Sequence, residues 1–145
     1  MIRAMKAATF LALLVFPVVA LSQSGINKTC AAGGDPSSYV QVHGRLGVYN
    51  GGYPNLRIWH IGTNHIFGIF GDPADLRCQR TGKCDGDQDT NLPSNLDRLM
   101  RLPNPLFEYW VYGDFRLRPL EPFQPGHQQA ACIVSADHLF RAKSD

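Results

Sequence analysis

Three aspartates at alternate positions follow a cysteine near the middle of the chain, and this spacing is typical of the first half of a calcium loop. The four side chains that could bind calcium through oxygen are Asp85, Asp87, Asp89 and Asn91. A complete twelve-residue loop also needs a glycine at position 6 and a bidentate carboxylate at position 12. Those positions hold Thr90 and Leu96 here, and Pro93 stands at position 9. We therefore predict a solvated acidic turn and no cofactor, with a weak calcium site as the alternative.

Histidine, serine and aspartate residues form no recognisable catalytic motif. His60 and His65 flank a tight turn, but two imidazoles without a third ligand seldom make a metal site. Ser135, Asp137 and His138 carry the letters of a hydrolase triad, yet neighbours in sequence cannot converge in triad geometry. The chain also lacks G-x-S-x-G, H-E-x-x-H and P-loop sequences. We therefore predict no catalytic residue and no enzyme; a deep pocket with convergent His and Asp side chains would argue the opposite.

Aromatic side chains with a nearby arginine are the third group that could do chemistry. Ring faces stack on sugar rings or other planar groups, and an arginine adds a cation that is attracted to the rings. Trp59 and Arg57 alternate with the apolar Leu56 and Ile58, so they share the outer face of a predicted strand. The interpretation that we favour for Trp59 itself is that it packs beneath the N-terminal arm or the acidic loop, and ligand binding through its ring is the other interpretation. The candidate ligand-binding residues are Tyr49, Tyr53, Arg57, Trp59 and Phe123.

The first residues have the pattern of an export signal. Arg3 and Lys6 precede an almost uninterrupted apolar run over residues 7–21. That run is shorter than the ~20 residues that span a bilayer. Small residues at Ala20 and Ser22 suit a signal peptidase, so we expect cleavage after Ser22 and no membrane anchor afterwards. The sequence thus predicts a periplasmic or secreted protein with a signal peptide over 1–22, a flexible arm over 23–38 and one domain over 39–145.

The charge balance argues against a nucleic-acid partner. The sequence holds 14 Lys and Arg residues against 12 Asp and Glu residues, and two of the basic ones, Arg3 and Lys6, leave with the signal. Basic and acidic residues are then equal in number, whereas nucleic-acid binding draws on a clustered positive field. The partners that remain are a glycan, a peptide or another envelope protein.

All four cysteines lie beyond the signal and predict two disulfides, since an even count is typical of exported domains. Three pairings are open. Cys78 and Cys84 have five residues between them, so a small local ring is the most favourable closure. That pairing leaves Cys30 with Cys132 and would tie the start of the domain to its last strand. The spacing lacks the C-x2–4-C knuckle of a zinc site.

Alternating apolar and polar residues predict five short strands. Apolar residues at 40, 42, 46 and 48 alternate with polar or small ones, and Gly44 in the same row suits a bulge or bend. The predicted strands cover residues 39–49, 55–61, 65–70, 109–120 and 129–134. Residues 136–142 are predicted as a short helix or frayed tail.

The order of elements favours one fold class. Residues 71–91 show no apolar period and are predicted as a loop. Ser94 and Asp97 then have the spacing of a capping box, and the helix they start ends before Pro103. Three strands, a short helix and two strands are the order of an oligonucleotide/oligosaccharide-binding (OB) barrel. We therefore predict a mainly β, five-stranded antiparallel OB-like barrel with one helix between strands 3 and 4; another small antiparallel barrel or a sandwich is the alternative.

Two segments resemble the ends of a family of small exported bacterial proteins of unknown function. They are VHGRLGVYNGGYPNLRIWHIGT over residues 42–63 and YGDFRLRPLEPFQPGHQQAACIVSA over residues 112–136. The shared patterns are V-H-G-R-L, R-I-W, D-F…P-L and C-x-x-S-A. These motifs belong to strands and turns, so the resemblance implies secretion and a β-rich fold and carries no catalytic or ligand-binding role.

Overall fold

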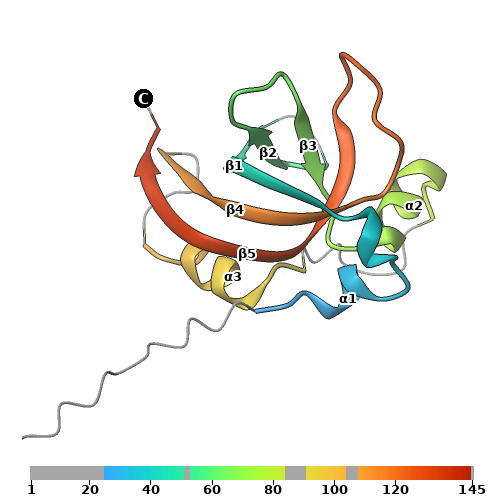
Figure 1. The fold of residues 1–145 in the computed structure, drawn as a ribbon, viewed down its shortest axis with the longest axis horizontal. Helices are drawn as coiled ribbons and strands as arrows, with labels where there is room; N and C mark the ends of the chain where they lie inside the picture. The colour runs from blue at the N-terminus through green and yellow to red at the C-terminus, as the bar shows by residue number, and fades with distance from the viewer. Residues whose placement is uncertain (1–24, 51–52, 84–90, 104–107, 145) are drawn as a thin grey trace, which may run out of the picture.

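The computed structural model describes residues 25–50, 53–83, 91–103 and 108–144, and the chain in these ranges is mainly β (Figure 1). Its five strands are β1 (Val40–Val48), β2 (Leu56–His60), β3 (Ile66–Ile69), β4 (Tyr109–Pro119) and β5 (Gln129–Lys143). All five begin within about a residue of where the alternating pattern predicts them. The last strand runs much further than predicted, and the expected helix over 136–142 is wrong. β5 continues because it pairs with β4 along almost the whole length of both strands.

The five strands form one mixed sheet in the order β1-β2-β3-β5-β4, and this order closes on itself because β1 pairs with both β2 and β4. Four of the pairings are antiparallel. The fifth, between β3 and β5, is parallel, with Phe67 opposite Gln129. The prediction of an entirely antiparallel sheet is therefore wrong. Strand direction within this pair depends on the path of the intervening chain, which apolar alternation does not report.

The core is the apolar face of each strand. Leu46, Ile58 and Phe115 are at most 1% exposed and face the interior together with the apolar residues of the other strands. The helix α3 (Ser94–Met100) lies along β5 in Figure 1 and adds the fully buried Leu96 to this core. Since inward residues alternate with outward ones, every second residue of β1, β2 and β4 is left on the outer surface.

A second helix, α2 (Pro73–Thr81), occupies part of the segment that we predicted as a loop. Asp72 and Asp75 form a reciprocal capping box, and Gly82 ends the helix with a left-handed φ of 66°. The signals for this helix are therefore at its two ends. The sequence of α2 shows no apolar period because this helix buries only two residues, Leu76 and Cys78.

The helix predicted after residue 93 is confirmed, but its predicted cap is wrong. Pro93 is the N-cap residue, Ser94 is already helical, and no side chain caps the first turn. Among the described residues between β3 and β4 there are thus two helices, α2 and α3, whereas we predicted one.

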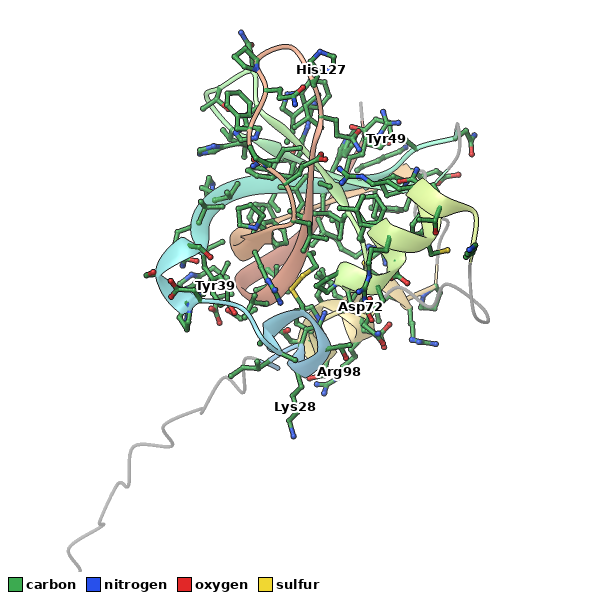
Figure 2. All side chains as sticks on the ribbon, turned by 90° about the vertical axis from the view of Figure 1, so that its right-hand side faces the viewer. Lys28, Tyr39, Tyr49, Asp72, Arg98 and His127 are labelled. Atoms are coloured by element: carbon green, nitrogen blue, oxygen red, sulfur yellow. A yellow bond between two sulfur atoms is a disulfide. The ribbon has the colours of Figure 1, made fainter. Side chains whose placement is uncertain are left out.

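The segment before β1 is joined to the sheet by covalent and hydrogen bonds. It contains the short helices α1 (Lys28–Ala31) and η1 (Pro36–Ser38). Cys30 forms a disulfide with Cys132 of β5, with 5.8 Å between their Cα atoms (Figure 2, yellow bond). The buried Asn27 donates its side-chain amide to the Asn91 carbonyl at 2.7 Å. The predicted disulfide between Cys30 and Cys132 is thus confirmed.

The second predicted disulfide and the predicted signal fall wholly or partly outside the described residues. Cys84 and residues 1–22 lie in the undescribed ranges, while Cys78 is disulfide-bonded and no described cysteine is a free thiol. Within the described ranges, no helix combines the length and the apolar character that a membrane crossing requires.

Candidate functional site

The acidic segment that could bind calcium is largely outside the described residues. Asp85, Asp87 and Asp89 are not described, and Asn91 uses its backbone carbonyl to accept the Asn27 amide. In the part of the chain that the structure describes, no group of three or more His, Cys, Asp or Glu side chains is arranged to hold a metal ion. The solvated acidic turn that we predict, and the weak calcium site that is its alternative, therefore both stay predictions.

Among the described residues, two of the five predicted ligand-binding residues, Tyr53 and Phe123, pack their rings against residues other than the remaining three. Tyr53 packs edge-on against Phe70 with 5.2 Å between ring centroids, in a buried cluster that includes Leu76 of α2. Phe123 lies in the loop between β4 and β5, where its ring centroid is 4.3 Å from that of His65. The same loop carries His127, which Figure 2 shows at the top of the molecule.

The other three, Tyr49, Arg57 and Trp59, come together with two residues that the sequence did not single out. The Arg45 guanidinium carbon lies 4.8 Å from the ring centroid of Trp59 and 4.5 Å from that of Trp110. Trp110 in turn lies 5.8 Å from the ring of Tyr49, and the Arg57 guanidinium lies 4.9 Å from the Tyr49 centroid. We call this set the arginine–aromatic stack; in spatial order it is Trp59, Arg45, Trp110, Tyr49 and Arg57.

Strand register assembles this stack. Arg45 of β1 is directly opposite Trp59 of β2, and Gly47 is opposite Arg57. Gly47 has no side chain, and a Cβ atom there would lie 2.2 Å from the Trp110 ring. The outward row of β1 therefore contains a gap that the indole of β4 fills. Arg45 and Gly47 both carry a recognisable signal in the sequence, since they occupy outward positions, but their contact with Trp110 depends on how β1 and β4 pair.

The stack is half-exposed and positively charged. All five of its side chains are of intermediate exposure. Among the described residues, neither Arg45 nor Arg57 forms an ion pair with a carboxylate. When a guanidinium lies flat on an aromatic ring, its N–H donors lie in the plane of the guanidinium and therefore do not point at the ring. Burial raises the pKa of Tyr49 even though Arg45 and Arg57 act in the opposite direction, so this phenol stays neutral.

The aromatic surface continues across β4 onto β5. Tyr112 is opposite Arg45 in the pairing of β1 with β4, and opposite Phe140 in the pairing of β4 with β5. The Tyr112 and Phe140 rings are stacked, with a centroid distance of 5.2 Å and an interplanar angle of 10°. Phe140 is 54% exposed, which leaves this end of the row open to solvent.

Beside the stack, three strands bring two histidines onto one carboxylate. Asp114 of β4 accepts His43 Nδ1 of β1 at 2.7 Å and His138 Nδ1 of β5 at 2.8 Å. This histidine–aspartate cluster borders a cavity of about 390 Å³, together with Asp137. The pairing of β4 with β5 has an irregularity at this point, and His138 has a left-handed φ of 51°. A bulge turns successive side chains toward one face, which explains how His138 reaches Asp114.

The cluster fixes the protonation pattern of its imidazoles. Hydrogen bonds from His43 and then His138 lower the pKa of Asp114, so its carboxylate is ionised at neutral pH and only accepts. Each Nδ1 therefore donates, and Nε2 of a neutral ring keeps a lone pair. The His43, Asp114 and His138 side chains are 61%, 42% and 84% exposed, so the site is shallow. The sequence alone does not indicate this cluster, because its three residues are far apart in the chain and meet only through strand pairing and a bulge.

Comparison with protein-family models, curated proteins and solved structures gives no match to this chain. We therefore infer the function of the outer face from the geometry of its side chains.

Proposed function

We propose that this protein is an exported OB-like barrel that acts as a binding module. The strand order β1-β2-β3-β5-β4, with helices between β3 and β4, supports the OB-like assignment. The disulfide between Cys30 and Cys132 and the signal-like residues 1–22 support an oxidising compartment, either the periplasm or the outside of the cell. The partner class is a glycan, with a peptide or an envelope protein as the competing classes.

The arginine–aromatic stack is the observation that carries this proposal. Trp59, Trp110 and Tyr49 lie on the outer surface of the sheet, and each keeps part of its ring in contact with solvent. Such ring surfaces suit the flat C–H faces of sugar rings, and the guanidinium groups of Arg45 and Arg57 beside them suit hydroxyl and acidic oxygens. A glycan therefore matches both the apolar and the donor groups of this surface.

Calorimetric titration of the purified protein with soluble polysaccharides tests this function. Trp110→Ala removes the central ring and should lower the affinity at least tenfold for any polysaccharide that the wild type binds. Phe123→Ala is the matched control, since it removes an aromatic side chain that is 50% exposed and lies against His65 in the β4–β5 loop. Equal effects of the two substitutions, or unchanged binding by a folded Trp110→Ala variant, would contradict the proposal.

A second candidate function, acid–base catalysis, is favoured by the histidine–aspartate cluster. Asp114 orients both imidazoles and leaves Nε2 of each able to accept a proton. A panel of activated esters and glycosides tests it: activity should fall at least a hundredfold in a variant combining His43→Ala and His138→Ala. If the wild-type protein is no more active than the double variant on every substrate, this function is excluded.

A further inference from the structure

A second cavity lies next to the arginine–aromatic stack, between α2, the segment before β2 and the loop between β4 and β5. Its volume is about 340 Å³. We call it the α2 pocket; the polar side chains that line it belong to Tyr53, Arg57, Gln79, Arg80, Glu121 and Gln128. Arg57 belongs to both sites, since it lines this pocket and stacks over Tyr49.

Hydrogen-bond acceptors in the α2 pocket are already in use. Glu121 pairs with Arg80 through one carboxylate oxygen and accepts the Ala130 amide at 2.7 Å through the other. The side-chain amide of Gln79 donates to the Tyr53 carbonyl. The charges of Arg80 and Glu121 thus offset each other. The other arginine that lines the pocket, Arg57, forms no ion pair with a carboxylate among the described residues.

Donors in the same pocket lack partners. Arg57 Nε is buried, and within the described ranges it has no hydrogen-bond acceptor. Gly68 is directly opposite Arg57 on β3, and a Cβ atom on Gly68 would lie 1.8 Å from Gln128 Nε2. The Gln128 amide therefore rests on the strand backbone beside Arg57. Burial, and secondly the charge of Asp75, raise the pKa of Tyr53, so its phenol keeps its proton.

We propose that the α2 pocket binds the carboxylate of an acidic sugar whose neighbouring rings lie on the arginine–aromatic stack. This inference rests on the proposed function and names its ligand class, a uronate-containing polysaccharide. A carboxylate is planar and takes two parallel N–H bonds from one edge of a guanidinium. Arg57 lines the pocket and has no carboxylate partner among the described residues, so its N–H groups that face the cavity would supply that edge, while Gln128 supplies a further donor. The continuity of pocket and stack through Arg57 lets one polymer engage both.

Matched polymers test the proposal directly. The purified protein is titrated calorimetrically with polygalacturonate, polymannuronate and hyaluronate, and with the methyl ester of each. At least one acid form should bind ten or more times tighter than its ester, because esterification removes the charge and leaves the ring faces unchanged. Arg57→Gln should reduce the affinity for the acid form to that for the ester.

Arg45→Gln is the matched control, since Arg45 belongs to the stack but does not line the α2 pocket. It should weaken binding of acid and ester forms by the same factor. If acid and ester bind equally and Trp110→Ala weakens both, the proposed function stands and this inference is overturned. If none of these polymers binds in either form, this inference is overturned, and the titration with other soluble polysaccharides decides the proposed function separately. Binding of polyglutamate that Trp110→Ala leaves unchanged would identify an acidic peptide and overturn the sugar assignment.

Discussion

Trp110 rests on the backbone of Gly47, and this contact shows how one missing side chain shapes the outer face. A Cβ atom at position 47 would lie 2.2 Å from the indole. The ring atoms concerned belong to the bulk of the side chain and cannot move aside without leaving Arg45. Gly47 is thus a steric requirement of the arginine–aromatic stack.

We expect Gly47→Ala to destabilise the protein by about 1–3 kcal/mol, since the indole must be displaced from β1. Urea unfolding of the wild type and of the Gly47→Ala variant measures this difference in stability. In a Trp110→Ala background the same substitution should be neutral or slightly stabilising, because alanine is preferred to glycine in a strand by roughly 0.5–1 kcal/mol. An equal cost in both backgrounds would show that the ring does not lie over Gly47.

The carboxylate of Asp114 makes the stability of the outer face depend on pH. Hydrogen bonds from His43 and His138 lower its pKa from the ordinary value of 3.8. The ionised form is therefore favoured by folding. Its contribution is complete above pH 3.8 and is lost as the pH falls through the lower pKa of the folded state.

The stability difference between wild type and Asp114→Asn should accordingly shrink as the pH falls below about 4. Urea unfolding at a series of pH values measures this difference. The side chain is 42% exposed, so solvent screening keeps the change small. In a variant that combines His43→Ala with His138→Ala, both donors are gone, and Asp114→Asn should have the same effect at every pH.

At the scale of elements, the two helices between β3 and β4 begin in different ways. Asp72 accepts the amides of Ala74 and Asp75 at 2.7 and 3.1 Å, and the Asp75 carboxylate accepts the Asp72 amide. No side chain performs this role for α3, where Ser94 is already helical. The helix start that the sequence pattern indicated is thus uncapped, and the helix without an apolar period has the complete box.

We expect Asp72→Ala to cost about 1 kcal/mol, because it leaves the first-turn amides of α2 without an acceptor. Ser94→Ala is the matched control and should change the stability by less than ~0.5 kcal/mol. Thermal and urea unfolding of the two variants give the comparison. A larger loss from Ser94→Ala than from Asp72→Ala would contradict the capping assignment.

At the scale of the whole molecule, one disulfide joins the segment before β1 to the last strand. Cys30 and Cys132 are 102 residues apart in sequence, and both are fully buried. The buried Asn27 strengthens the same junction, since its backbone amide donates to the Val134 carbonyl at 2.8 Å. Arg118 adds hydrogen bonds to the Cys30 and Ala32 carbonyls, both at 2.8 Å.

Replacing both cysteines, by Cys30→Ala and Cys132→Ala, should lower the free energy of unfolding by about 3–5 kcal/mol, since a loop of this length is costly to close in the unfolded chain. Urea unfolding measures the loss, and limited proteolysis should reveal faster cleavage between residues 25 and 38. A change below ~1 kcal/mol with unchanged protease resistance would show that hydrogen bonds alone hold this segment.

The sequence predicted those features that depend on neighbouring residues. Alternation in residues 39–49 located β1, because a strand with one buried face imposes a two-residue period. The mainly β class followed from the same pattern, and the disulfide between Cys30 and Cys132 was predicted only as the pair left over by a short ring between Cys78 and Cys84. The candidates Tyr49, Arg57 and Trp59 were found because outward aromatic residues stand out against an apolar row.

Tertiary structure decided everything that depends on register between distant segments. The parallel pairing of β3 with β5, the insertion of Trp110 over Gly47 and the meeting of His43 with Asp114 all follow from which strands pair and in what alignment. Tyr53 and Phe123 lie outside the strands and are not part of the arginine–aromatic stack, although Tyr53 lines the α2 pocket with Arg57. Local periodicity fixes which face of a strand points outward, whereas long-range hydrogen bonding fixes which outward side chains become neighbours, and that second choice assembles the surface that we propose binds a glycan.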